Sequence, residues 1–175
     1  FDTKAQMVMG CDSAGSDLPQ YGLPVFQKYG WVGYIAVPGR VWLSGSKLIT
    51  DWNATANPYV AQMNAAGWEN TNHGANHLAM GTLTAPGEID YEIAAPLAKY
   101  QQGGMVRGME MYASPQSSSS RLSETIIRNR NIKLQRHARK SNISVTPYGI
   151  DNPHHIGAID IGNVAAGGIA TSSGA

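Results

Sequence analysis

The sequence predicts an α/β fold with a largely parallel sheet. Short β-type runs alternate with longer segments of helical character along its 175 residues, and this alternation is typical of βαβ units. The length and the ordinary composition indicate one domain with a sizeable core. The formal net charge of +1 implies no polyanionic or membrane partner, and no run approaches the roughly twenty apolar residues that a membrane helix needs.

The strands and the helix expected over residues 5–37 are predicted by short apolar runs and by the turn-forming residues that end these runs. A strand is expected over residues 5–11, followed by a polar turn over 12–17. A helix interrupted by Pro24 is expected over 20–29, and the aromatic and β-branched run 31–37 predicts a buried strand. Pro38 and Gly39 stop that strand and begin a loop that extends to Asn57.

The middle of the chain predicts two helices and two further strands. A helix is expected over 58–66, ended by Gly67, and a third strand begins at 68–70. The clearest helix covers 84–100, with Thr84 as its cap and an apolar stripe that should face the core. That stripe consists of Ile89, Ile93 and Leu97. A strand is expected over 105–111.

The ends of the chain carry less structural information. Phe1 rather than a methionine begins the chain, so we expect a fragment or a processed product. We expect one domain over 1–161 and a loosely ordered, Gly/Ala/Ser-rich end, or a connection to a further part, over 162–175. Cys11 is the only cysteine, which excludes an intrachain disulfide.

The segment from Asn72 to His77 is the most informative in the chain. His73 and His77 are four residues apart, and two neutral imidazoles at this spacing can close on one metal ion. The pair follows the third strand, and Asp12 ends the first. Because ligand sites of parallel α/β folds form at the carboxyl ends of strands, these residues should converge on one edge of the sheet.

Three segments, 23–30, 63–70 and 72–77, resemble the NodB-homology polysaccharide deacetylases. The resemblance covers roughly residues 5–115, with a weaker continuation to about Ile161. It implies a distorted (β/α) barrel. It also implies an acidic turn that supplies a catalytic base and a metal-binding aspartate, and a histidine pair that supplies the other two metal ligands.

Transferred residue by residue, the resemblance makes Asp12 the catalytic base and His73, His77 and Ser13 the metal-binding positions. Ser13 stands where the family has an aspartate, so one carboxylate is missing. A register shifted by one residue would make Asp12 the metal ligand and place Cys11 at the base. Asp17 is close enough along the turn to act as a substitute ligand.

The remaining family motifs match less closely. The third motif falls at 112–117, where Pro115 fits and groups around Tyr112 would stabilise an oxyanion, while Arg107 could reach the base. The general acid would be His154 or His155. Among the tryptophans, Trp42 or Trp52 is expected to stack on a sugar ring.

The resemblance implies metal-assisted hydrolysis of acetyl groups from an N- or O-acetylated polysaccharide, with a divalent cation, zinc by preference. The alternative is a degenerate domain that binds glycan or builds an assembly without catalysis. An extracellular, cell-envelope or virion location is expected, either as a homo-oligomer or in a larger virion assembly.

The segment 121–140 holds more than half of the basic residues of the chain. A solvated basic face is the expected explanation, and a nucleic-acid partner is a weaker one because no aromatic residues are interleaved for base stacking. No glycine-rich dinucleotide or Walker signature occurs between a strand and a helix.

Overall fold

The computed structural model describes residues 9–12, 18–39, 41–43, 47–49, 58–102, 107–138 and 156–158. Side chains of 41–43, 47–49 and 156–158 are outside this description. The predicted end segment 162–175 lies outside the described residues as well.

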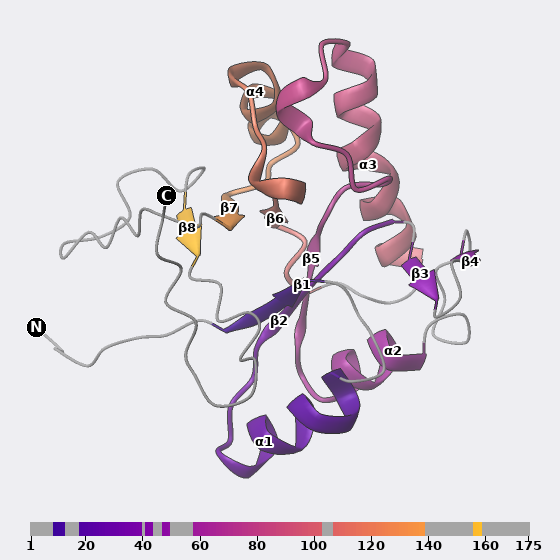
Figure 1. Cartoon of the computed structure of the whole chain (residues 1–175), viewed down its shortest axis with the longest axis vertical. Coiled ribbons are helices and arrows are strands. Elements are labelled where there is room, and N and C mark those ends of the chain that lie inside the picture. Colours follow the sequence, from indigo (N-terminus) through magenta and orange to yellow (C-terminus); the bar gives the residue numbers. More distant parts are fainter. Residues whose placement is uncertain are drawn as a thin grey trace, which may run out of the picture.

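A six-stranded sheet forms the centre of the molecule (Figure 1). Its strands lie in chain order, and every described pairing within it is parallel. The predicted parallel α/β architecture is therefore confirmed. The strands are β1 (Gly10–Asp12), β2 (Tyr34–Val37), β5 (Glu69–Asn72), β6 (Met111–Ala113), β7 (Leu134–Ala138) and β8 (Ile156–Ala158).

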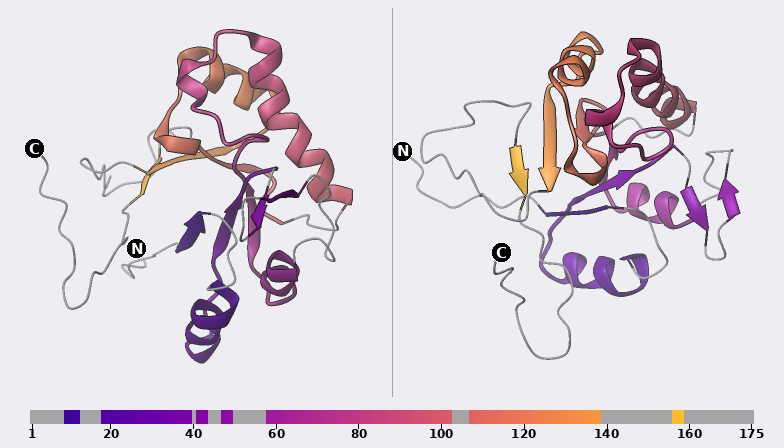
Figure 2. Two further views of the ribbon diagram at one scale, coloured as in Figure 1. Left: turned by 45° about the vertical axis from the view of Figure 1, so that its right-hand side comes forward. Right: turned by 45° about the horizontal axis from the view of Figure 1, so that its top comes forward.

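The sheet is curled rather than flat (Figure 2). Asp12 on β1 and Arg136 on β7 form an ion pair, although three strands lie between them in the sheet. Neighbouring strands are about 4.8 Å apart, so these two strands would be about 19 Å apart in a flat sheet. Only a curled sheet brings the two side chains together, which agrees with the expected distorted (β/α) barrel.

The first pair of helices covers the part of the sheet around β2. A π-helical turn, η1 (Leu18–Gly22), leads into α1 (Leu23–Lys28), and α2 (Pro58–Ala65) follows later in the chain. Pro24 lies in the first turn of α1, where its missing N–H is not needed, so it does not interrupt the helix. The core on this side consists of Ile35, Val37, Met63, Trp68 and Tyr100.

The second pair of helices, α3 (Pro86–Gln102) and α4 (Arg121–Asn129), packs together farther along the sheet. Ile89 and Ile93 are fully buried and Leu97 packs against them, which confirms the predicted apolar stripe. Because α3 begins at Pro86, Thr84 lies before the cap position, and the predicted cap is wrong.

Alternate residues of β2 face opposite sides of the sheet. Ile35 and Val37 pack toward the helices, whereas Tyr34 and Ala36 form a small inner cluster with Ala113. This alternation is the period-two geometry of a strand that is buried on both faces. The inside of the curl is therefore lined partly by the small side chains of Ala36 and Ala113.

Several predicted boundaries are wrong. The strand expected over 31–37 begins only at Tyr34. Residues 107–110 form a turn, so β6 begins at Met111, where the predicted strand 105–111 ended. The loop expected after Pro38 contains an antiparallel hairpin of β3 (Val41–Leu43) and β4 (Lys47–Ile49).

The basic segment 121–140 contains α4 and β7 rather than a single polar face. Two short 3-10 helices, η2 (Met80–Thr82) and η3 (Pro115–Ser117), complete the described elements. Within the described residues, no helix has both the length and the apolar character needed to cross a lipid bilayer.

Candidate metal centre

The two histidines lie directly beyond the carboxyl end of β5. His73 follows the last strand residue, Gly74 has a φ of +76°, and His77 has a φ of 59°. Two left-handed residues allow the backbone to reverse within one short loop. As a result the rings meet, and their Nε2 atoms are 3.1 Å apart.

His73 is oriented by a backbone carbonyl. Its Nδ1 donates a hydrogen bond of 2.7 Å to the carbonyl oxygen of Ala113 at the end of β6. Burial lowers the pKa of the imidazole, and the Ala113 hydrogen bond opposes this shift. The neutral ring with its proton on Nδ1 carries a lone pair on Nε2, the atom that faces His77. This is the orientation used by metal-binding histidines.

The loop between the histidines is held by the fully buried Glu92 of α3. Both the backbone N–H and the side-chain Nδ2 of Asn76 donate to the Glu92 carboxylate. Asn72 adds a second clamp, since its Oδ1 accepts from the Gly74 N–H and its Nδ2 donates to the carbonyl of Ile93. Helix α3 therefore fixes the backbone that presents both imidazoles.

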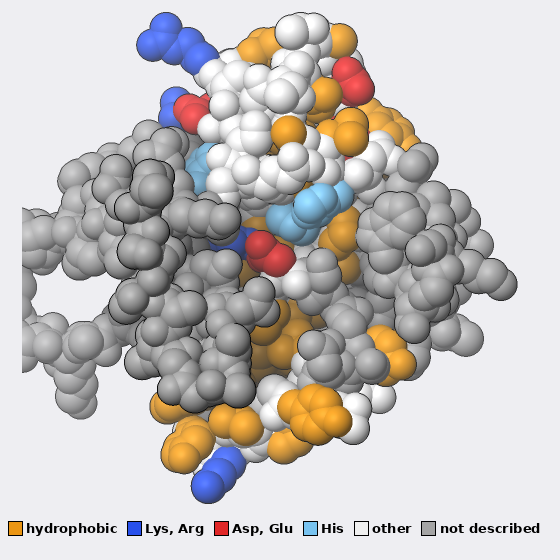
Figure 3. Space-filling model, viewed as in Figure 1, with side chains coloured by type: hydrophobic (Ala, Val, Ile, Leu, Met, Phe, Trp, Pro, Cys, Tyr) orange, Lys and Arg blue, Asp and Glu red, His pale blue; other side chains and the backbone are white. Residues whose placement is uncertain are grey.

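Asp12 reaches the same edge of the sheet from β1. Arg136 donates to its Oδ1 from β7, and the guanidinium also lies 5.9 Å from the centre of the Tyr34 ring. The negative charge of Asp12 acts to raise the pKa of His73, so the two side chains interact electrostatically. Acidic and basic atoms accordingly lie beside the central group of histidine atoms in Figure 3.

The histidine pair fits a divalent cation such as zinc. Tetrahedral zinc at about 2.05 Å from each nitrogen separates two ligand nitrogens by about 3.3 Å, close to the 3.1 Å found here. A full site needs at least one more protein ligand. Among the described residues no group of three His, Cys, Asp or Glu side chains could hold a metal. Ser13 and Asp17 lie outside these residues.

The other predicted site residues lie either away from the histidine pair or outside the described residues. The Tyr112 side chain is fully buried in the α3/α4 core, so its hydroxyl is not exposed to a substrate. That other groups around Tyr112 stabilise an oxyanion stays a prediction. Arg107 donates to Asn64 and to the Trp68 carbonyl instead of reaching Asp12. The side chain of Trp42 and the whole of Trp52, His154 and His155 lie outside the described residues.

Two important residues were missed by the sequence analysis. Arg136 was counted within a solvated basic face, yet its side chain is only 13% exposed and it pairs with Asp12. Glu92 lies in the predicted helix 84–100, of which only the apolar stripe was expected to face the core. Its position three residues after Ile89 and one before Ile93, on the buried side of α3, is the one sequence signal that could have identified a buried carboxylate.

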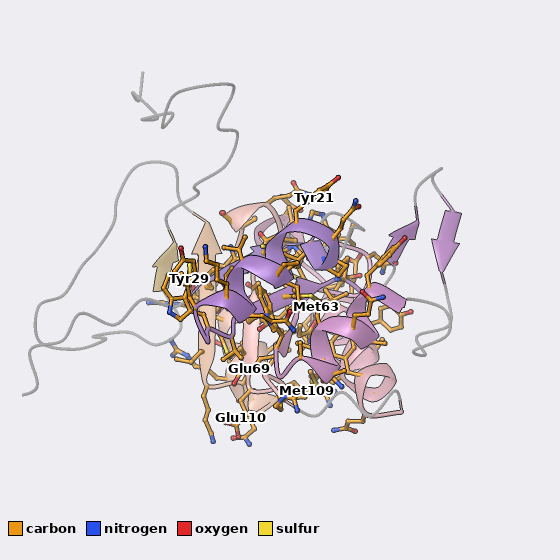
Figure 4. The ribbon with its side chains drawn as sticks, turned by 90° about the horizontal axis from the view of Figure 1, so that it is seen from below. Tyr21, Tyr29, Met63, Glu69, Met109 and Glu110 are labelled. Atoms are coloured by element: carbon orange, nitrogen blue, oxygen red, sulfur yellow. The ribbon has the colours of Figure 1, made fainter. Side chains whose placement is uncertain are left out.

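The opposite edge of the sheet, where β5 begins, contains a hollow without histidines in its described lining. Figure 4 shows Glu69, the first residue of β5, near Met109 and Glu110. A hollow of about 600 Å³ lies here, lined by these residues together with Gly108, Met111, Lys133 and Leu134. Its described lining contains no histidine, so the candidate metal centre belongs to the carboxyl edge of the strands.

No protein-family model and no curated protein matches this sequence. Solved structures do share its fold. A deacetylase from Streptococcus pyogenes in complex with acetate has a TM-score of 0.71 at 16% identity over 90% of this chain and 65% of its own. A family 4 acetyl xylan esterase from Clostridium thermocellum in complex with a cobalt ion has a TM-score of 0.57 at 17% identity. The match covers 80% of this chain and 62% of the esterase chain.

A third neighbour is a family 4 pseudoenzyme from Bacillus anthracis, with a TM-score of 0.61 at 17% identity over 77% of this chain and 44% of its own. The present chain thus spans less than two thirds of each of these three structures. The likeness extends over most of the present chain and includes its curled parallel sheet. The chain therefore has the distorted (β/α) barrel fold of the family 4 carbohydrate esterases.

Proposed function

We propose that this chain is a metal-dependent deacetylase that hydrolyses acetyl groups from an N- or O-acetylated polysaccharide. The observation that supports this most directly is the close approach of the His73 and His77 rings beyond the carboxyl end of β5, at the edge of the sheet where β1 ends at Asp12. The structural neighbours include a deacetylase and an acetyl xylan esterase. A divalent cation is the proposed cofactor, with zinc favoured by the two imidazole ligands.

In this proposal each residue has a definite task. The cation, when bound, would polarise the acetyl carbonyl and lower the pKa of water. His73 and His77 would hold this cation. Asp12 accepts a proton from the attacking water at Oδ2, because Arg136 occupies Oδ1 and no described residue donates to Oδ2. His154 or His155 would protonate the departing amine or alcohol.

The direct test is acetate release from acetylated glycans, measured with and without a chelator, together with the metal content of the purified protein. We expect stoichiometric divalent metal and chelator-sensitive acetate release. His73→Ala and His77→Ala should each remove both metal and activity while circular dichroism shows that the fold is retained. Undiminished acetate release by folded His73→Ala protein would contradict the proposal.

A second candidate function is a domain that binds glycan or builds an assembly without catalysis. Two observations favour it: Ser13 stands at the position of the expected aspartate, and a structural neighbour is a pseudoenzyme. It predicts glycan binding that survives chelation and no detectable acetate. The same experiment therefore separates the two functions.

We also propose an extracellular, cell-envelope or virion setting, as a homo-oligomer or as part of a larger virion assembly. The support is the proposed substrate, because polysaccharides that carry acetyl groups are found at cell surfaces. Nucleic acid is a weaker partner, since three cations of the basic segment, Arg130, Lys133 and Arg136, are used in ion pairs. Fractionation of source material with an antibody against this chain would test the setting.

A further inference from the structure

Hydrophobic side chains are exposed along the outer side of η1 and α1 and on the loop that follows. Seven large hydrophobic side chains of the described residues are exposed, and five of them lie within residues 21–32. In Figure 3 hydrophobic side chains gather at the lower end of the molecule, where Figure 1 places α1. We call these five side chains the outer patch: Tyr21, Val25, Tyr29, Trp31 and Val32.

The outer patch is one continuous surface. Tyr21, Val25 and Tyr29 are four residues apart, so they follow one another along one side of the helical stretch. Figure 4 shows Tyr21 and Tyr29 toward its two ends. The Tyr29 ring stacks on that of Trp31, with the two ring centres 4.9 Å apart, and Val32 is next in the chain. Exposed hydrophobic residues that are scattered singly are ordinary, whereas a contiguous patch marks an interaction surface.

The helical stretch that carries the outer patch is apolar on both of its sides. Leu18, Leu23 and Phe26 pack inward against the core. Residues 18–33 contain a single charged residue, Lys28. A surface helix normally has a polar outer side, and a helix that is hydrophobic all round is normally covered on both sides. The outer patch therefore has the character of a surface that a partner covers.

The area and the chemistry of the outer patch fit a second copy of the chain. The five residues are 46–66% exposed, which amounts to on the order of 500 Å² of largely apolar surface. A stable interface buries about 800 Å² on each partner and has an aromatic, charge-poor centre with a polar rim. The patch would supply such a centre and more than half of the area. Because Tyr29 and Trp31 are already stacked, little side-chain freedom would be lost on association.

A lipid surface is the less favoured partner. Helices that lie on membranes carry several Lys or Arg residues on their polar side, whereas this stretch has only Lys28. The Nζ of Lys28 lies 5.4 Å from the centre of the Tyr29 ring. With one cation and no acidic residue, two copies of the stretch can approach each other with little charge repulsion.

We propose that two copies of this chain associate through the outer patch about a two-fold axis, so that each copy presents the same surface to the other. Trp31 and Val32 come shortly before β2, at the edge where the strands begin. The histidines lie beyond the carboxyl end of β5, so association at this end leaves both candidate metal centres open. The proposal assigns a surface to the proposed homo-oligomer and does not depend on the deacetylase function.

The test is sedimentation equilibrium of the 175-residue chain over concentrations from about 1 μM to about 1 mM. We expect the mass to rise from 18.7 kDa to twice that value. Tyr29→Glu should weaken the dimer at least tenfold, because a charge would be buried twice in a symmetric interface. Tyr91→Glu is the matched control, since Tyr91 of α3 is 54% exposed against 55% for Tyr29 and lies outside the patch. It should leave the dimer unchanged.

Val25→Glu provides a second variant of the patch if Tyr29→Glu does not fold, as judged by circular dichroism. A wild-type protein that stays monomeric at the highest concentration would overturn the proposal. Equal dissociation constants for wild type and the folded patch variant would overturn it as well, and so would equal weakening by Tyr91→Glu. Cosedimentation of monomeric wild-type protein with phosphatidylglycerol vesicles, lost in Tyr29→Glu, would assign the patch to a lipid surface instead. None of these measurements requires acetate release, so they stand apart from the test of the deacetylase.

Discussion

Arg136 and Asp12 form an ion pair at the carboxyl edge of the sheet although 124 residues separate them in the sequence. Arg136 is the more buried partner, with 13% of its side chain exposed against 41% for Asp12. The guanidinium therefore fixes one oxygen of a carboxylate that is itself well exposed. A base held in one orientation is better placed to accept a proton than one that rotates freely.

We expect substitutions of Asp12 and Arg136 to lower kcat to different extents. Asp12→Asn should lower kcat by roughly 10²–10⁴-fold, because the proton acceptor is lost. Arg136→Ala should lower kcat by on the order of 10²-fold through misplacement of Asp12, with metal content unchanged. Arg130→Ala breaks the exposed pair with Asp90 on the far helices and serves as the control, with activity equal to wild type. Full activity in Arg136→Ala would show that the ion pair does not position the base.

We expect that any side chain at position 74 destabilises the fold. Its φ is +76°, and a Cβ there would lie 3.1 Å from Glu92 Oε2 and 3.4 Å from Pro115. Gly74→Ala should therefore lower the free energy of unfolding by about 1–3 kcal/mol and weaken metal binding. Gly87→Ala in α3 is the matched control, because a Cβ there meets no atom within 4 Å. It should be neutral or stabilise the fold by about 0.4–1 kcal/mol. Equal denaturation midpoints for the two variants would refute this.

The buried imidazole of His73 predicts a pH dependence of stability in metal-free protein. Burial lowers its pKa below the ordinary 6.5, so the unfolded chain binds a proton at a higher pH than the folded chain does. The contribution of His73 is then fully present above pH 6.5 and is lost as the pH falls below it. Urea titrations with a chelator should show the free energy of unfolding decreasing from pH 7 to pH 5. His73→Gln should flatten this slope, and an unaltered slope would exclude His73 as its source.

Ser13 predicts weak metal binding that one substitution can strengthen. Ser13→Asp restores a carboxylate at the position where the resembling family has its metal-binding aspartate, so we expect zinc affinity to rise at least tenfold, roughly 1.4 kcal/mol. Competition with a fluorescent chelator would measure it. Ser13→Asn has a similar shape without the charge and should give little gain. If both variants gain equally, the added charge is not the cause.

The histidine pair could be located from the sequence because all the features that identify it lie close together in the chain. The spacing of His73 and His77, the glycine between them and the strand before them all lie within a short segment, and the structure brings the two rings together as expected. The long helix over 84–100 was similarly accessible, since its apolar stripe repeats with helical periodicity.

The partners of these residues could not be predicted in the same way. Arg136 contacts Asp12 only because the whole sheet is curled. No sequence pattern near either residue indicates that contact. Glu92 contacts Asn76 through the packing of α3 on the loop. The short strands β3, β4 and β6 were missed or displaced because three residues are too few to show a period.

The sheet order has a consequence for the synthesis of the chain. Each later strand of the six-stranded sheet pairs with the strand of that sheet that comes before it in the sequence, so these strands can be added one after another as the polypeptide leaves the ribosome. The ion pair with Asp12 can form only when β7 has been added, because Arg136 arrives with that strand. Until then Asp12 lacks the cation that pairs with it, so we expect the proposed base to be fixed in one orientation only late in synthesis.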